Sequence, residues 1–207
     1  MLTVGLTGSS GSGKGYVCGI FKEKGIPCLD TDKVCREVYK KGHKCYYDLV
    51  GAFGEGILGQ DGEIDRKVLF ELTFSDSEKY SLLNSIAFTH ILKETKRWLA
   101  LTEEQGNEIA VVDAPMLYES GFNSLCDKTV CVIADRPTQI SRIVKRDGIS
   151  EEAAVLRLDK QKKNLYYTSR ANYTLDNSAA NELKIYTDTS RLIGVLRRFA
   201  RRRKNKK

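Results

Sequence analysis

Short apolar runs alternate with longer amphipathic stretches along the chain. Five runs have the length of buried strands, at 2–6, 26–29, 109–112, 129–133 and 173–175. Helical spacing of apolar positions is seen at 13–24, 76–104, 137–146, from 150 to past 161, and at 178–199. Continuous apolar strands separated by helices are typical of a parallel sheet with both faces covered. The pattern predicts an α/β fold, namely a three-layer α/β/α sandwich around a parallel five-stranded sheet.

Two segments exceed what the connections of such a sheet need. Roughly eighty residues separate the second and third expected strands, whereas a crossover needs about a dozen. The excess predicts an inserted helical subdomain at 36–105. A second insertion, charged and helical, predicts a lid over 141–170. The expected organisation is therefore a core formed by 1–35, 106–140 and 171–200, with the subdomain, the lid and a basic tail at 201–207.

The net charge of +7 over 207 residues is concentrated at the C-terminal end. Nine basic residues and no acid occur from Arg191 onward, so the remainder is close to neutral. Such an end can contact nucleic acid nonspecifically. A solvated terminus is more common, and no recognition module accompanies the basic residues. Nucleic acid is therefore not an expected partner.

Membrane and secretory signals are not found in the sequence. No apolar run has the length needed to cross a membrane, and no basic and apolar leader opens the chain. The six cysteines include no C-x-x-C pair, which argues against a zinc site and favours free thiols in a reducing compartment. These features predict a cytoplasmic protein with no membrane partner.

A glycine- and serine-rich loop follows the first expected strand and precedes the first helix. Its G-x-x-x-x-G-K pattern consists of Gly8, Ser9, Ser10, Gly11, Ser12, Gly13 and Lys14. Glycines let backbone N–H groups approach phosphates, and a helix N-terminus attracts anions. The lysine would place its charge between the outer phosphates of a nucleotide. The loop predicts ATP binding, and a glycine-rich turn without a ligand is the alternative.

The position after Lys14 departs from this phosphate-loop pattern. Ser or Thr normally stands there and offers a hydroxyl to Mg²⁺, but this chain has Gly15. A water can take the vacant coordination position, because Mg²⁺ keeps several waters in proteins. We therefore still expect Mg²⁺ as the cofactor, with one protein ligand fewer.

Acidic residues follow two other expected strands, at the sheet edge where α/β proteins bind ligands. Asp32, in the sequence Asp30-Thr31-Asp32, could accept the proton of a hydroxyl that attacks the γ-phosphate. Equally, Asp32 or Thr31 could cap the helix that follows. Asp113 follows the third strand, and we expect it to hold Mg²⁺ through water.

Basic side chains gather in and around the expected lid. They are Arg136, Arg142, Arg146, Arg157, Lys160 and Arg170. Guanidinium groups stabilise the charge that spreads over the oxygens of a phosphoryl group in transfer. Arg142 and Arg146 are four residues apart and share a helix face. We expect one or two of these cations to contact phosphate and the others to be solvated.

In their order along the chain, these motifs resemble those of the dephospho-CoA kinase family. The matching pieces are GLTGSSGSGK at 5–14, LDTD at 29–32, FGEGIL and DGEIDR within 53–66, LN at 83–84, DAPMLYE at 113–119, RIVKRDG at 142–148, RLDKQ at 157–161 and ANYTLDN at 171–177. Three departures from the family are seen: Gly15 and Tyr16 replace Ser and Thr, Ile91 replaces a proline, and Asn172 replaces an acid.

The resemblance implies a fold, a reaction and a set of site residues. The fold is a P-loop core with an acceptor-binding subdomain at 36–105 and a lid, and the substrates are ATP and dephospho-CoA. The family's reaction phosphorylates the 3′-hydroxyl of the acceptor ribose. The implied catalytic residues are Asp32 as base, Lys14 and Arg142. The implied ATP-binding residues are Gly8, Ser9, Ser10, Gly11, Ser12, Gly13, Lys14, Gly15, Arg142 and Asn177.

Three other functions stay open at the level of sequence. The chain could be another small-molecule P-loop kinase, acting on a nucleoside or nucleotide. Gly15 could mark an ATP-binding protein with little turnover. The basic tail could bind nucleic acid.

Overall fold

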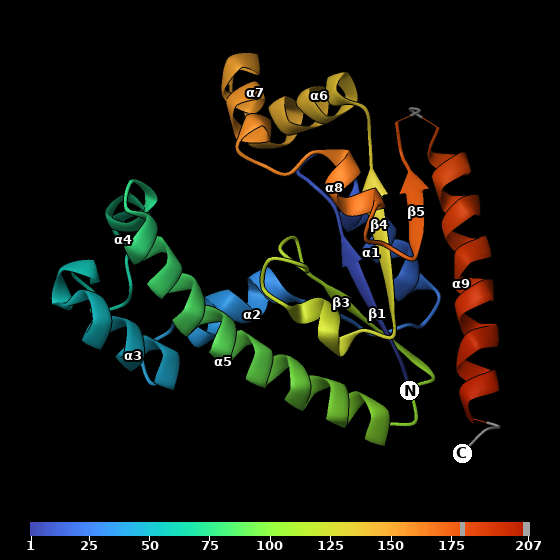
Figure 1. Cartoon of the computed structure of the whole chain (residues 1–207), viewed down its shortest axis with the longest axis horizontal. Helices are drawn as coiled ribbons and strands as arrows, with labels where there is room; N and C mark the ends of the chain where they lie inside the picture. Colours follow the sequence, from blue (N-terminus) through green and yellow to red (C-terminus); the bar gives the residue numbers. More distant parts are fainter. Residues whose placement is uncertain (179–180, 205–207) are drawn as a thin grey trace. The chain divides into compact units, whose positions relative to one another are not determined.

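The computed structural model describes residues 1–178 and 181–204. The strands in this part of the chain form one sheet in the order β2-β3-β1-β4-β5 (Figure 1). They are β1 (Leu2–Thr7), β2 (Cys28–Asp30), β3 (Ile109–Asp113), β4 (Lys128–Ile133) and β5 (Tyr173–Asp176). Strand β1 pairs in parallel with β3 and β4, and β4 pairs in parallel with β5. The sheet thus confirms the predicted α/β class and places the loop after β1 at the centre of its carboxyl edge.

Helices α1 (Lys14–Glu23) and α9 (Glu182–Lys204) cover one face of the sheet (Figure 1). Their apolar side chains join those of β1 in one core, in which Leu6, Phe21 and Leu196 are fully buried. On the opposite face a Cβ at Gly5 would lie 2.8 Å from Leu117 Cδ2. The segment after β3, with the short helix η2 (Phe122–Leu125), therefore packs directly on the backbone of the central strand.

The last helix begins and ends later than the expected 178–199. Asn181 accepts a hydrogen bond from Lys184 N at 3.0 Å through its side chain, which fixes the start of α9. At the other end Arg203 forms an ion pair with Asp127. Basic residues of the expected tail therefore continue the helix to Lys204, and the remaining tail residues lie outside the described part.

Three helices lie between β4 and β5: α6 (Arg136–Asp147), α7 (Glu151–Asp159) and α8 (Asn164–Thr168). Ser150 caps α7 as predicted, accepting a hydrogen bond from Ala153 N at 3.2 Å. Gly148 takes the left-handed conformation (φ 65°) that lets the chain turn between α6 and α7. The prediction that α7 continues past Gln161 was wrong, because the helix ends at Asp159. Helices α6 and α7 share a small apolar core of their own around Ile143.

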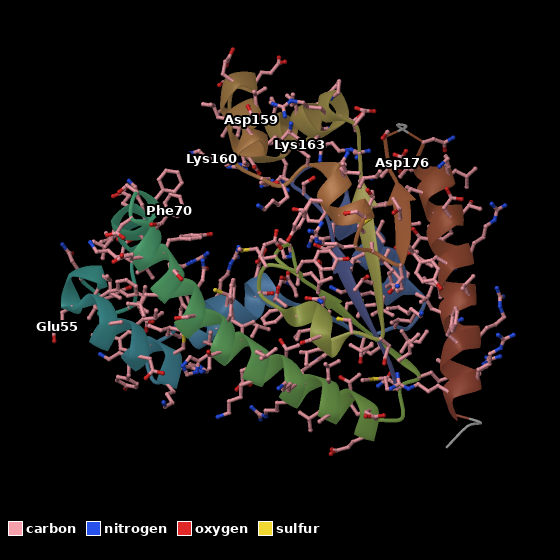
Figure 2. All side chains as sticks on the ribbon, in the orientation of Figure 1. Glu55, Phe70, Asp159, Lys160, Lys163 and Asp176 are labelled. Carbon is pink, nitrogen blue, oxygen red and sulfur yellow. The ribbon has the colours of Figure 1, made fainter. Side chains whose placement is uncertain are left out.

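The chain divides into two compact units, one formed by Met1–Leu29 and the chain from Leu99 onward, the other by Asp30–Trp98. The second unit holds α2 (Thr31–Val38), α3 (Lys44–Phe53), η1 (Glu55–Ile57), α4 (Arg66–Phe74) and most of α5 (Ser77–Glu104). Its core includes the fully buried Leu49 and Ile57. Phe70 projects from α4 with half of its surface exposed (Figure 2). No helix in the described part of the chain combines the length and the apolarity that a membrane crossing needs.

Candidate active site

The predicted phosphate loop connects β1 to α1 and leaves several backbone donors unused. Tyr16 N and Val17 N donate to Gly13 O at 3.0 and 3.2 Å, so the helix begins immediately after the loop. In the described part of the chain, several backbone N–H groups of the loop have no acceptor, among them those of Gly11, Gly13, Lys14 and Gly15. Unused N–H groups at the start of a helix form a site for an anion. The loop therefore has the donors that phosphate oxygens require.

Two glycines of the loop are required by close contacts as well as by backbone conformation. Gly11 has φ 74°, and a Cβ there would lie 2.5 Å from Gln139 O. Gly13 has φ 91°, and its Cβ would lie 2.0 Å from Asn177 Nδ2. Any side chain at either position would displace α6 or the end of β5. The glycine pattern thus serves the packing of the loop and its approach to a ligand together.

Lys14 and Asp113 form an ion pair at the carboxyl edge of the sheet. The register of β1 and β3 places Leu6 opposite Asp113, and Lys14 opens α1 just beyond β1. Both side chains are largely enclosed, with 17% and 8% of their surfaces exposed. Pairing offsets the cost of enclosing two charges. A phosphate arriving at the loop would compete with Asp113 for the ammonium group of Lys14.

Few side chains around the loop could bind Mg²⁺. The described residues contain no group of three or more His, Cys, Asp or Glu side chains suited to a metal. Asp113 offers a carboxylate and Gly15 offers no side chain, while the buried hydroxyl of Ser12 has no hydrogen-bond partner among residues 1–178 and 181–204. Mg²⁺ in kinases is held by one or two carboxylates, phosphate oxygens and waters. The residues fit a metal that enters with the nucleotide.

Arg142 and Asn177, two of the residues expected at the nucleotide site, meet at the phosphate loop. Arg142 donates to Gly11 O at 3.3 Å through Nη1 and to Asn177 O at 3.0 Å through Nη2. Asn177 Nδ2 donates to Ser12 O at 2.9 Å. These bonds link α6 and the end of β5 to the loop and hold a cation beside its carbonyl groups.

Three other arginines of the predicted lid region, Arg136, Arg146 and Arg157, pair with carboxylates. Arg146 Nε donates to Asp147 Oδ1 at 2.7 Å, and Arg157 also pairs with Asp147. The hydrogen bond from Arg146, followed by that from Arg157, lowers the pKa of Asp147 to about 2. Arg136 pairs with Asp159 at 2.8 Å. Among these four arginines, Arg142 is the one bonded to the loop.

Two glutamines of the site were missed by the sequence analysis. Gln139 Nε2 donates to Ser9 Oγ at 2.6 Å and to Ser10 O at 3.1 Å. Gln161 accepts from Ser10 N at 2.9 Å through Oε1 and donates to Ser10 Oγ at 3.2 Å. The three-residue spacing of Gln139 and Arg142 on α6 was a usable signal, because such residues share a helix face.

The proposed base lies in the second unit, at the start of α2. Asp30 Oδ1 accepts from Asp32 N at 2.9 Å and from Lys33 N at 3.2 Å, so Asp30 is the N-cap. The alternative prediction that Asp32 or Thr31 caps this helix was therefore wrong. Within its own unit the exposed carboxylate of Asp32 has no hydrogen bond or ion pair, so it has no evident structural role there.

A parallel sheet of this order, with a G-x-x-x-x-G-K loop between β1 and α1, defines a P-loop protein of the small-molecule kinase class. The family model described as dephospho-CoA kinase matches residues 2–182. A dephospho-CoA kinase from Shouchella clausii is 34% identical over 181 residues, which cover 87% of this chain and 92% of that protein. The chain belongs to the dephospho-CoA kinase family.

Solved structures agree with this fold. The crystal structure of TT1252 from Thermus thermophilus has a TM-score of 0.82 at 25% identity, covering 94% of this chain and 96% of that one. A dephospho-CoA kinase from Campylobacter jejuni has a TM-score of 0.70 at 21% identity, covering 95% of this chain and 97% of that one. At the latter identity the likeness concerns the fold alone.

Proposed function

We propose that this chain transfers the γ-phosphate of ATP to the 3′-hydroxyl of dephospho-CoA, giving coenzyme A and ADP. The observation that carries the proposal is the extent of the family match. It covers residues 2–182 and so includes the phosphate loop, the second unit and the α6–α7 lid in one alignment. A match confined to the loop would support ATP binding without an acceptor.

The loop binds the phosphates of ATP in this proposal. Its unused N–H groups donate hydrogen bonds to phosphate oxygens, and Lys14 exchanges its partner Asp113 for the outer phosphates. Asp113, released from Lys14, is the residue that would hold Mg²⁺. When bound, the metal neutralises charge on the phosphates. Arg142 adds a fixed positive charge beside the loop.

Asp32 is the base in this proposal. It accepts the proton of the acceptor hydroxyl as that oxygen attacks the γ-phosphate. The role of Asp32 as base is supported by its free carboxylate. Asp30 caps the helix, so the Asp32 carboxylate is exposed and unpaired within its own unit. The segment 36–105 is proposed as the acceptor-binding subdomain, and 141–170 as the lid.

A cytoplasmic location accords with the thiol chemistry of the chain. All six cysteines are free, as they would be in a reducing compartment.

An acceptor panel tests the proposal. The purified chain is incubated with ATP and Mg²⁺ and with dephospho-CoA, shikimate, a nucleoside or a nucleoside monophosphate, and ADP is measured over time. ADP should form rapidly with dephospho-CoA, and Lys14→Ala should abolish the reaction because it removes the charge that contacts the outer phosphates. Lys22→Ala, an exposed position on the same helix, is the matched control. Turnover with another acceptor in preference to dephospho-CoA would overturn the proposal.

A further inference from the structure

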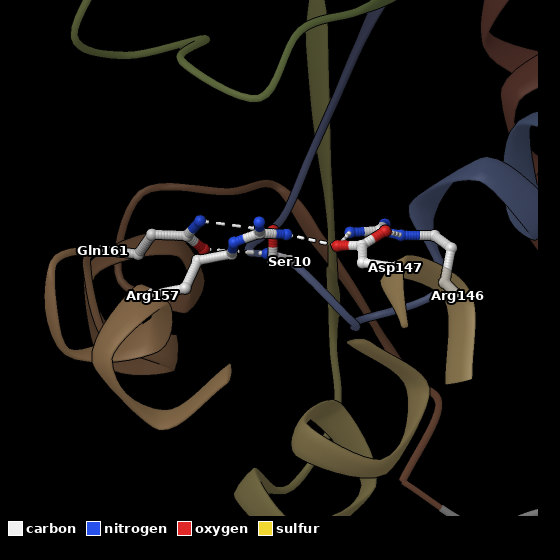
Figure 3. A network of polar contacts seen from close by, with 5 residues as sticks. All are labelled: Ser10, Arg146, Asp147, Arg157 and Gln161. Atoms are coloured by element: carbon white, nitrogen blue, oxygen red, sulfur yellow. Dashed lines mark hydrogen bonds and ion pairs between the residues drawn. The ribbon is translucent and has the colours of Figure 1, made fainter. Parts of the chain in front are cut away.

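Every polar group of Ser10 is bonded to a glutamine amide. Gln161 accepts a hydrogen bond from the backbone N–H of Ser10 and donates one to its hydroxyl, and Gln139 donates one to its carbonyl oxygen. These two glutamines come from different parts of the α6–α7 region, more than a hundred residues from the loop in sequence. Figure 3 shows the Gln161 amide facing Ser10. The polar groups of one phosphate-loop residue are thus all bonded to glutamines, Gln161 of the lid and Gln139 of α6.

Gln161 follows helix α7, which is bonded to α6. Its own backbone N–H donates to Leu158 O at 3.1 Å, which continues the last turn of α7. Arg157 is four residues earlier, and it pairs with Asp147 at the end of α6 (Figure 3). Asp147 also binds Arg146. Helix α7 is therefore anchored to α6 close to the point where Gln161 meets the loop.

The hydrogen bonds of the loop divide its N–H groups into two sets. Ser10 N–H is occupied by Gln161, whereas those of Gly11, Gly13, Lys14 and Gly15 have no acceptor in the described residues. A primary amide carries two N–H donors. Gln161 Nε2 uses one on Ser10 Oγ, and the other has no acceptor in the described part of the chain. A free donor therefore lies next to the free N–H groups of the loop.

We propose that Gln161 is a positioning residue that keeps the lid closed on the phosphate loop while ATP is bound. Its amide stays on Ser10, its second N–H donates to an oxygen of the terminal phosphate, and the closed lid excludes water from the reacting groups. This inference rests on the proposed function in one respect only, namely that dephospho-CoA is the molecule that accepts the phosphate. The contact with Ser10 and its effect on ATP do not depend on that identity.

Hydrogen exchange tests the contact without any activity measurement. In the nucleotide-free protein, the peptide that contains Ser10 should exchange about five- to tenfold faster in Gln161→Ala than in the parent, because two hydrogen bonds are lost. Gln105→Ala is the matched control, since Gln105 is an exposed glutamine at the end of α5. Unchanged exchange in Gln161→Ala would show that the contact does not form.

Kinetics then separate positioning from a merely structural contact. Gln161→Ala should weaken ATP binding only about three- to tenfold, because one hydrogen bond to a charged phosphate oxygen is lost while the free N–H groups of the loop remain. It should lower the rate of transfer to dephospho-CoA and raise ADP formation without acceptor, as water enters an open lid. If Gln161→Ala instead binds ATP more tightly and transfers faster, the amide competes with phosphate and the proposal is wrong.

Gln161→Glu provides the second variant. A carboxylate can accept from both the N–H and the hydroxyl of Ser10, so protection of the nucleotide-free loop should persist. The same carboxylate would repel the terminal phosphate, so ATP affinity should fall at least tenfold. Unaltered ATP affinity in Gln161→Glu would place this side chain away from the phosphate and overturn the proposal. If the parent protein binds ATP but does not phosphorylate dephospho-CoA, the proposed function fails, while exchange and ATP affinity still decide the role of Gln161.

Discussion

Gly15→Ser should improve this enzyme, because Gly15 occupies the position where P-loop proteins place a metal-binding hydroxyl. Gly15 is the second residue of α1, its φ is not positive, and a Cβ built on it meets nothing within 4 Å. The structure therefore accommodates a serine at this position without strain.

Two gains can be sized from this geometry. Ser exceeds Gly in helix propensity by roughly 0.5 kcal/mol, which corresponds to a Tm increase of about 1–2 °C for a chain of this length. A protein oxygen that replaces one ordered water on Mg²⁺ regains up to about 2 kcal/mol of immobilisation entropy. We expect the Mg²⁺ concentration at half-maximal rate to fall about fivefold, which needs roughly 1 kcal/mol, well within that limit.

The assay is a Mg²⁺ titration of the transfer rate at saturating ATP and dephospho-CoA, with a thermal melt of each variant. Gly19→Ser is the matched control, because Gly19 lies in the same helix and its Cβ also meets nothing within 4 Å. Gly19→Ser should raise the Tm and leave the Mg²⁺ dependence unchanged. If Gly15→Ser behaves like Gly19→Ser in both measurements, a serine at this position does not contact the metal and the reasoning is refuted.

Three further predictions follow from the charged residues. Asp32→Asn should keep ATP affinity and lower kcat about 10²–10⁴-fold in steady-state assays, and an unchanged kcat would exclude Asp32 as the base. Asp30→Ala, which removes the cap of α2, should instead lower the free energy of unfolding in denaturant by about 1 kcal/mol. Because the pKa of Asp147 is lowered to about 2, its contribution to stability is complete above about pH 4 and is lost as the pH falls towards 2. In urea unfolding, the Asp147→Asn variant should therefore lose less stability over this pH range than the parent protein does. Equal losses in the two proteins would contradict the lowered pKa. Deleting Arg201 to Lys207 should lower the Tm slightly through loss of the pair with Asp127 and leave kcat unchanged; a large loss of kcat would place the tail in the site.

The sheet and the phosphate loop could be predicted because their signals are local. Strand β1 is buried along its whole length, so its apolar run is continuous, and the whole glycine and lysine pattern of the loop lies within seven consecutive residues. Asp113 could be placed because a residue at the carboxyl end of a parallel strand lies at the ligand-binding edge. The ion pair with Lys14 confirms that this carboxylate lies beside the loop.

The contact between Gln161 and Ser10 could not be predicted because it depends on tertiary structure alone. Gln161 and Ser10 are 151 residues apart in the sequence. The glutamine amide is uncharged, so it does not stand out in the pattern of charged residues. The cap of α2 was misplaced by one or two residues because Asp30 is both the last residue of β2 and the N-cap. The start of α9 was misplaced because a capping Asn181 was not distinguished from the polar residues before it.

The most direct test of the proposed reaction is the structure of its product. Purified protein, ATP, Mg²⁺ and dephospho-CoA are incubated to completion, and the CoA product is analysed by mass spectrometry and by ¹H and ³¹P NMR. The account predicts one added phosphate monoester, coupled to the H3′ proton of the adenosine ribose, and one ADP per ester formed. ATP consumption without any phosphate ester on dephospho-CoA, or an ester at another position of the acceptor, would contradict it.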